Sequence, residues 1–269
     1  MTAAPTLART DLNNYLRRIG YAGGLTPTYD VLAALHQAHA THIPFENLDI
    51  LLGRPIRLDL ASLHAKLVVG RRGGYCFEQN LLFAAILQSI GFSVARLAAR
   101  VRYRTHRVLP RTHMLLLVSI DAEDWIADVG FGLAGLLAPL LFTPGEEAHQ
   151  SAWTYRVVQE RGDWVLQWQQ DGSWVDLYEF SLVPQQMADY EMANYYTSTH
   201  PDSRFVQTLT AQRIAPDMRY LLRNRELTAD DGTTTTKRLV ADDEELLKVL
   251  AEVFDLRFPA GTRFRYEER

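Results

Sequence analysis

The sequence has very little cysteine and no long hydrophobic run. Its 269 residues include a single cysteine, Cys76, so no disulfide can form within the chain. This composition excludes a disulfide-stabilised secreted domain and favours a reducing compartment, so we expect a cytoplasmic protein. Residues 1–24 lack the apolar stretch of a signal peptide, and the uncharged stretch 129–142 is shorter than the about 20 residues that cross a bilayer. We therefore expect no membrane partner.

The sequence also lacks an excess of charge of either sign. There are 28 basic and 32 acidic residues, which gives a formal net charge of -4. A general nucleic-acid-binding domain would be clearly basic, so we expect no nucleic-acid partner. Any surface that binds phosphate must be local.

Helical periodicity dominates the first third of the chain. Thr10 or Asp11 is expected to cap a first helix that stops at Gly20. Further apolar stripes with a helical period occupy residues 28–43, 60–69 and 76–90. These segments predict a small helical bundle.

The period changes to two after residue 90. Apolar residues alternate with arginines over 94–103, and short strand-like segments separated by turn residues follow at 114–120, 125–129, 153–160, 163–169 and 173–180. Consecutive antiparallel strands of this kind indicate a barrel or a strongly curved sheet. Two more strand-like stretches, 219–227 and 233–240, precede a helix predicted over 242–254.

Cys76 lies at the predicted start of a helix, directly after Gly73 and Gly74. A helix N-terminus carries partial positive charge, which stabilises a thiolate, and the glycines allow a ligand or another backbone to come close. These features indicate a nucleophile whose neighbouring amide can donate to an oxyanion. The alternative is that Cys76 is a small buried hydrophobic residue.

A nucleophilic thiolate needs a base and a group that orients the base. His113 begins a strand, and a hairpin turn centred on Asp121-Ala122 places Asp128 one diagonal step away on the same face. A turn shifted by half a register places Asp128 directly opposite His113. Asp128 is then expected to hold the histidine, unless it only satisfies the local backbone.

The other histidines carry a weaker signal. His36, His39 and His42 are spaced by three along a predicted helix, which makes a metal site imaginable. No cysteine or carboxylate cluster accompanies them, so surface or interhelix packing is favoured and no metal is expected.

Five sequence blocks together resemble the arylamine N-acetyltransferases, also called N-hydroxyarylamine O-acetyltransferases in bacteria. They are IPFENLD at 43–49, RGGYCFE at 72–78, RTH at 111–113, ADVGFG at 127–132 and YTSTHP at 196–201. The resemblance implies an α+β fold with a papain-like Cys-His-Asp core. In this chain the parts would be a helical bundle over 1–90, an antiparallel β-barrel over 91–200 and an α/β lid over 201–269.

The resemblance also implies the chemistry. Cys76 would accept an acetyl group from acetyl-CoA, with His113 as its base and Asp128 as the orienting residue. An arylamine, hydrazine or N-hydroxyarylamine would then take the acetyl group, so the mechanism would be ping-pong. Acetyl-CoA would be a cosubstrate, no cofactor would remain bound, and the protein would be a monomer or homodimer.

Binding residues follow from the same resemblance. Phe45, Val101, Phe131 and Phe205 match positions that line the acceptor pocket, although core packing is the competing explanation for each. Backbone N–H groups around Gly130 and Gly132 could cradle the pyrophosphate of CoA. A stretch without acidic residues supplies six candidate cations, Arg96, Arg100, Arg102, Arg104, Arg107 and Arg111, for which a solvated strand face is the alternative.

Three rival functions remain open at this point. A cysteine hydrolase or transglutaminase-like enzyme could use the same triad on amides, although the papain-type sequence around the cysteine is absent. An amide synthase could use the same fold in biosynthesis. A binding module without catalysis is the third.

Overall fold

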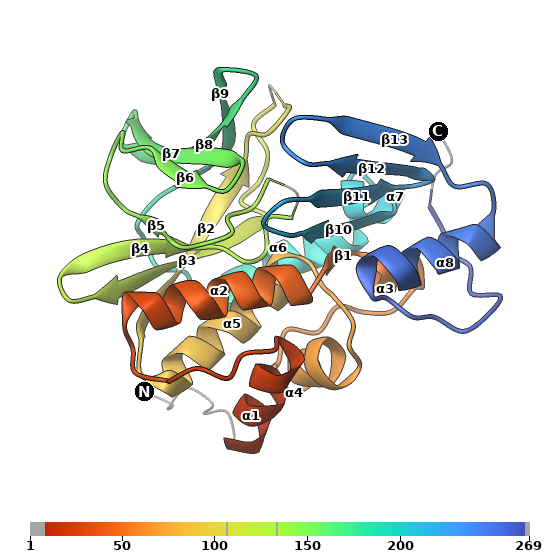
Figure 1. Ribbon diagram of the computed structural model, residues 1–269, viewed down its shortest axis with the longest axis horizontal. Coiled ribbons are helices and arrows are strands. Elements are labelled where there is room, and N and C mark those ends of the chain that lie inside the picture. Colours follow the sequence, from red (N-terminus) through yellow and green to blue (C-terminus); the bar gives the residue numbers. More distant parts are fainter. Residues whose placement is uncertain (1–8, 106, 133, 267–269) are drawn as a thin grey trace.

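The computed structural model describes residues 9–105, 107–132 and 134–266 of the chain. Helices gather below an eight-stranded sheet and a five-stranded sheet that lie side by side (Figure 1). The first eight residues, part of the segment in which we expect no signal peptide, lie outside the described residues. Within the described part of the chain, no helix is long and apolar enough to cross a membrane.

The N-terminal helices match the predicted segments except for the short α3, which was not predicted. They are α1 (Arg9–Arg18), α2 (Tyr29–His42), α3 (Leu48–Leu51), α4 (Leu60–Leu63), the π-helix η1 (His64–Val69) and α5 (Cys76–Ile90). Helix α2 begins where the Thr28 side chain accepts a hydrogen bond from the Val31 backbone, and α5 ends at Gly91 with a φ of 111°. The expected cap at Thr10 or Asp11 is wrong, because the helix already includes Arg9.

The segment predicted as one helix over 60–69 changes its winding midway. After Leu63 it widens into η1, in which the Gly70 amide donates to the Ala65 carbonyl, five residues back, at 2.8 Å. Such wide turns are rare in proteins, and those that occur are often found at functional sites. Here η1 carries Lys66 towards the loop that precedes Cys76.

The eight-stranded sheet forms a nearly closed antiparallel barrel, as predicted. Its strands are β2 (Ser93–Val101), β3 (His113–Ile120), β4 (Glu123–Ala127), β5 (Leu140–Leu141), β6 (Ala148–Gln150), β7 (Trp153–Glu160), β8 (Asp163–Gln170) and β9 (Ser173–Phe180). They are hydrogen-bonded in the order β5-β4-β3-β2-β9-β8-β7-β6. A bridge between Pro144, just after β5, and Val157 of β7 brings the two ends together.

The hairpin of β3 and β4 has the first of the two registers considered. Asp121 and Ala122 both have positive φ, 51° and 74°, which is the signature of a type I′ turn. Ile120 pairs with Glu123, and Leu116 pairs with Ala127. Strand β4 therefore ends at Ala127, and Asp128 follows it directly.

The five-stranded sheet combines distant parts of the sequence. It contains β1 (Phe45–Glu46), β10 (Thr210–Ile214), β11 (Arg219–Arg223), β12 (Glu226–Asp230) and β13 (Thr235–Leu239), in that order. The predicted strand 219–227 is two strands, because the chain turns at Asn224 with a φ of 51°. Strands β1 and β10 were not predicted.

Three more helices complete the fold. They are α6 (Met187–Thr199), α7 (Arg204–Gln207) and α8 (Asp243–Phe254). Helix α8 begins as predicted, with Asp242 accepting a hydrogen bond from the Glu245 amide. Neither α6 nor α7 was predicted from the sequence.

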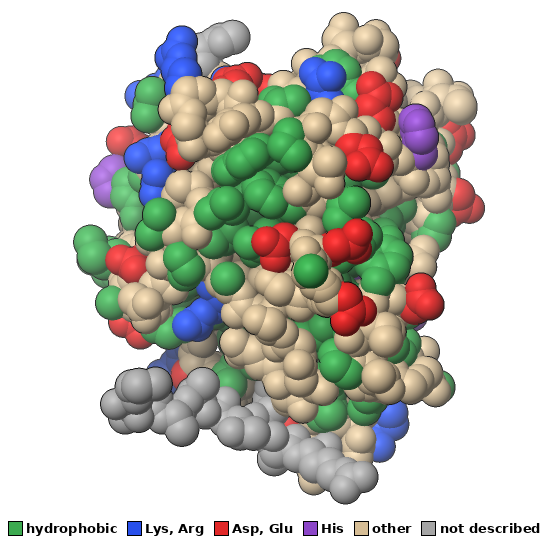
Figure 2. All heavy atoms as spheres, turned by 90° about the vertical axis from the view of Figure 1, so that its left-hand side faces the viewer, with side chains coloured by type: hydrophobic (Ala, Val, Ile, Leu, Met, Phe, Trp, Pro, Cys, Tyr) green, Lys and Arg blue, Asp and Glu red, His purple; other side chains and the backbone are tan. Residues whose placement is uncertain are grey.

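The largest core lies where α5 packs against the barrel. Buried side chains of α5 such as Phe77 and Leu81 share one apolar cluster with Met114 and Leu116 of β3. This packing brings the start of α5 next to the start of β3. Figure 2 shows the left-hand side of the molecule as drawn in Figure 1, with hydrophobic side chains in the middle of the face and acidic ones beside them.

Candidate active site

Cys76 is the first residue of α5 and is 3% exposed. Its thiol donates to the Thr112 carbonyl at 3.5 Å, immediately before His113. Gly130 packs directly on it, since a Cβ at Gly130 would lie 2.8 Å from the Cys76 Cα. The helix N-terminus and the close backbone of the 128–132 segment therefore enclose the sulfur.

His113 and Asp128 form a buried pair beside this thiol. The His113 Nε2 atom lies 2.7 Å from Asp128 Oδ2. This contact occupies Nε2 and leaves Nδ1 as the nitrogen that can serve Cys76. Thiol, imidazole and carboxylate thus have the order of a papain-like Cys-His-Asp core.

Asn80 holds the carboxylate in place, and the sequence reasoning did not identify it. Its Nδ2 donates to Asp128 Oδ1 at 2.9 Å and to the Met114 carbonyl at 2.6 Å, and its Oδ1 accepts from the Val129 amide at 3.1 Å. Asn80 follows Cys76 by one helical turn, so both side chains lie on one face of α5. This helical spacing is the sequence signal that could have identified Asn80.

The electrostatics of the pair favour a charged histidine. Burial opposes the charge, but the Asp128 carboxylate and a hydrogen bond with Cys76 together raise the pKa of His113 to about 10. Burial likewise disfavours the Asp128 carboxylate, yet His113 and Asn80 hold the pKa of Asp128 below its ordinary value. The site is therefore built to hold an imidazolium against the Asp128 carboxylate.

Aromatic rings cover the histidine. Phe131 meets the His113 ring edge-on with 5.0 Å between ring centroids, and Tyr178 lies 4.8 Å away. Burial and the nearby Asp128 carboxylate raise the pKa of Tyr178 well above its ordinary value, so this phenol stays neutral. The rings exclude water from the imidazole.

A small cavity opens beside Asp128. Phe45, Phe131 and Gly132 are among its lining residues, together with Gln79 and Gln212. The structure thus places two of the four predicted acceptor-pocket residues on one cavity.

The other two predicted pocket residues lie elsewhere. Val101 is half-buried at the end of β2, and Phe205 packs against the rings of Phe45 and Tyr75 at 5.9 and 5.6 Å. Neither lines this cavity.

The predicted phosphate cradle has little support at the first glycine. The Gly130 amide donates to Asp128 Oδ1 at 2.9 Å, so its N–H is already engaged. Gly132 has a φ of 83°, and a Cβ there would lie 2.2 Å from Gln212 Oε1. Both glycines are explained by close packing around the site.

The six candidate arginines divide into two groups. Arg100 of β2 lies 3.6 Å from Glu179, and Arg102, just after the strand, is paired with Glu160 and Asp176 at 2.9 and 2.8 Å. These side chains form a charged strand face, as the alternative interpretation expected. Arg96, also on β2, donates to the Met187 sulfur at 3.1 Å, whereas Arg104, Arg107 and Arg111 are exposed in the loop before His113.

Two histidines of α2 make hydrogen bonds to residues of the site. His36 accepts from the Asp128 amide at 3.1 Å and its other ring nitrogen lies 3.2 Å from the Leu137 carbonyl. His39 connects the Tyr15 hydroxyl to Gln79, whose amide donates to the Gly74 carbonyl at 2.8 Å. The packing interpretation of these histidines is correct, and the described residues contain no cluster of side chains that could hold a metal.

Comparison with known proteins agrees with the family resemblance along nearly the whole chain. A family model described as N-acetyltransferase matches residues 28–262. The chain is 43% identical over 248 residues to the arylamine N-acetyltransferase of Escherichia coli (strain K12), covering 91% of this chain and 88% of that one.

Solved structures agree in fold. The arylamine N-acetyltransferase from Salmonella typhimurium superposes with a TM-score of 0.88 at 39% identity, covering 93% and 92% of the two chains. The Mycobacterium marinum enzyme in complex with CoA gives 0.87 at 36% identity, covering 91% and 92%. With this identity and coverage, the chain belongs to the arylamine N-acetyltransferase family.

Proposed function

We propose that this protein transfers an acetyl group from acetyl-CoA to arylamines, hydrazines or N-hydroxyarylamines through an acetyl-Cys76 intermediate. The observation that carries the proposal is the buried contact of 2.7 Å between His113 and Asp128 beside the only thiol of the chain. The CoA complex of the M. marinum relative supports acetyl-CoA as the donor. We expect the enzyme to act in the cytoplasm, as a monomer or homodimer.

The first half-reaction uses the charged form of the pair. The Cys76 thiolate attacks the carbonyl carbon of acetyl-CoA, a new C–S bond forms, and the bond to the CoA sulfur breaks. The departing CoA thiolate takes the proton from the His113 imidazolium. Asp128 keeps the imidazole ring oriented during this transfer.

The second half-reaction restores the starting state. The acceptor nitrogen or hydroxylamine oxygen attacks the thioester carbon, and neutral His113 takes the proton that the acceptor loses. The bond to Cys76 then breaks and the thiolate is regenerated beside the imidazolium. Phe45 and Phe131 support the acceptor side of this step, because apolar walls keep water from hydrolysing the thioester.

The CoA phosphates need cations, and the loop before His113 is the best source. Arg104, Arg107 and Arg111 are exposed there, whereas Arg100 and Arg102 already face carboxylates. Guanidinium groups bind phosphate oxygens through charge-assisted hydrogen bonds. We therefore assign CoA binding to the loop and not to the face of β2.

Mass spectrometry of the intact protein tests the proposal. Incubation with acetyl-CoA alone should add one acetyl group, and a later addition of an arylamine or hydrazine should remove it. The variant Cys76→Ala should gain no acetyl group. An unmodified wild-type protein, or an equal adduct on the variant, would show that the proposal is wrong.

A further inference from the structure

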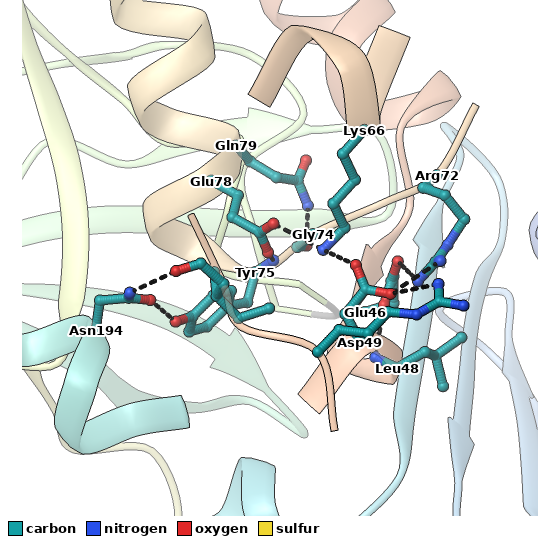
Figure 3. Close-up of polar contacts among 12 residues, drawn as sticks. Glu46, Leu48, Asp49, Lys66, Arg72, Gly74, Tyr75, Glu78, Gln79 and Asn194 are labelled. Carbon is teal, nitrogen blue, oxygen red and sulfur yellow. Dashed lines mark hydrogen bonds and ion pairs between the residues drawn. The ribbon is translucent and has the colours of Figure 1, made fainter. Parts of the chain in front are cut away.

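A buried ionic cluster lies at the start of α5, the helix that begins with the nucleophile. It consists of three carboxylates and two cations from β1, α3, η1, the loop before α5, and α5 itself, namely Glu46, Asp49, Lys66, Arg72 and Glu78. Their side chains are between 0% and 16% exposed. Figure 3 shows Lys66 reaching between Glu78 on one side and the Glu46–Asp49 side of the cluster on the other.

The contacts within the ionic cluster are short. Lys66 Nζ lies 2.7 Å from Glu78 Oε1 and 3.1 Å from Asp49 Oδ2. Arg72 contacts Glu46 Oε1 at 2.6 Å and Asp49 Oδ1 at 3.1 Å. Arg72 therefore serves Glu46 and Asp49, and Lys66 is the cation that serves Glu78.

Charge is not balanced inside the cluster, because three carboxylates share two buried cations. Burial raises the pKa of Glu78 to about 7, Lys66 opposes the rise, and the charge of Glu46 adds to it. The remaining neighbour, Arg54, reaches only Asp49, at 3.4 Å, from a largely exposed position. Glu78 therefore exchanges a proton in the neutral pH range.

Glu78 is also tied to the Gly74–Tyr75 peptide, which lies just before the nucleophile. Its Oε2 accepts from the Tyr75 amide at 3.1 Å, one residue before Cys76. A Cβ at Gly74 would lie 2.7 Å from the same oxygen, so the carboxylate folds back tightly over this loop. On the other side the Tyr75 hydroxyl donates to Asn194 of α6, as Figure 3 shows.

We propose that Glu78 is a positioning residue for Cys76, and that its ionised form, held by Lys66, fixes the Gly74–Tyr75 peptide and so holds the adjoining Cys76 in the reactive arrangement. Protonation removes the ion pair with Lys66 and loosens the carboxylate over the loop. The sulfur then meets His113 and the thioester less often in the productive geometry. This inference rests on the proposed role of Cys76.

The consequence is a pH dependence that His113 does not supply. The pKa of His113, raised to about 10, keeps the imidazolium charged from pH 6 to 8.5. The ionisable groups that act on Glu78 are Lys66 and Glu46, with Asp49 and Arg72 paired to them. Near the start of its own helix, the Tyr75 phenol also interacts with it. The rate of Cys76 acetylation should therefore fall as pH drops through about 7.

Rapid-quench measurement of the acetyl adduct, without acceptor, tests this between pH 5.5 and 8.5. In the wild type the acetylation rate constant should fall about tenfold across the step, with an unchanged dependence on acetyl-CoA concentration. Glu78→Gln imitates the protonated form, so its rate should be independent of pH and close to the low-pH value of the wild type. Glu226→Gln, which removes an exposed ion pair with Lys237, is the matched control and should keep the wild-type profile.

Two further variants predict shifts of opposite sign. Glu46→Gln removes a charge that raises the pKa of Glu78, so the step should move to lower pH. Lys66→Met removes a charge that lowers this pKa, so the step should move to higher pH. These shifts decide the question even if Glu78→Gln does not fold.

The outcomes separate this inference from the proposed function. Absence of any wild-type adduct would overturn the function itself. A normal adduct with no step near pH 7, a step retained in Glu78→Gln, or no shift in the two charge variants would overturn the role of Glu78 alone.

Discussion

At the scale of single residues, the site depends on one carboxylate that keeps one imidazole charged. Asp128 is buried, accepts from Asn80 and the Gly130 amide, and meets His113 at 2.7 Å. Its charge is the main reason why the pKa of His113 rises despite burial. Asparagine keeps the shape of this side chain and removes the charge.

Asp128→Asn should therefore reduce kcat strongly, by about 10⁴-fold if the carboxylate acts as in other triads. The same change should lower the pKa of His113, so the loss of activity at alkaline pH should begin at a lower pH than in the wild type. Steady-state assays of acetyl transfer across pH check both effects.

The matched control for this change is Asp124→Asn. Asp124 lies on the same hairpin, is exposed, and accepts from the Ser119 hydroxyl at 2.6 Å. A similar loss in both variants would contradict the special role of Asp128.

At the scale of elements, the buried histidines of helix α2 reduce the stability of the fold at acid pH. Burial lowers the pKa of His36 to about 4 and that of His39 to about 3. In the unfolded chain both have an ordinary pKa near 6.5. Below that value the unfolded state binds more protons than the folded state, so stability falls as pH falls towards 4.

His39→Gln should weaken this acid sensitivity. The free energy of unfolding of the wild type should lose about 1.4 kcal/mol per pH unit more than the variant between pH 6 and 4. Urea unfolding of both proteins at several pH values measures the difference, in which all unchanged groups cancel. His149→Gln, at an exposed position of β6, should retain the wild-type slope, and equal slopes in all three proteins would contradict the prediction.

The elements also show how far sequence reasoning reaches. The hairpin of β3 and β4 was predictable up to a choice between two registers, because the turn residues and the period of two fix which side chains share a face. Helix α6 was missed because its apolar residues follow no clear stripe, and β1 was missed because two residues cannot show a period. The π-helical turn of η1 depends on packing, which leaves no local signal.

The candidate site, like the fold, was predicted in part. Cys76, His113 and Asp128 could be identified from a helix start and a strand pairing. The support from Asn80 and His39 was missed, because their partners Asp128 and Gln79 lie far away in the sequence.

At the scale of the whole molecule, one buried arginine joins the second sheet to the barrel. Arg219 of β11 lies 3.7 Å from the ring of Trp153 and donates to the Tyr155 hydroxyl at 2.7 Å and to the Gly135 carbonyl at 3.2 Å. It is 1% exposed. A planar guanidinium can stack on a ring and donate in several directions at once, which an ammonium cannot do.

Arg219→Lys should therefore lower the free energy of unfolding by about 2 kcal/mol or more. Arg223→Lys, four residues later on the same strand and exposed, should change it by less than about 0.5 kcal/mol. Denaturant unfolding followed by tryptophan fluorescence measures both values. Equal stabilities for the two variants would show that Arg219 does not join the two sheets.

The short strand β1 has a consequence for how the enzyme is made. Phe45 bridges to Gly74 in the loop before the nucleophile and pairs with Gln212 of β10. During synthesis on a ribosome, Cys76 emerges long before the strand that completes this pairing. We expect the nascent N-terminal part to carry an unfinished active site, so that acetyl transfer begins only when nearly the whole chain has been translated.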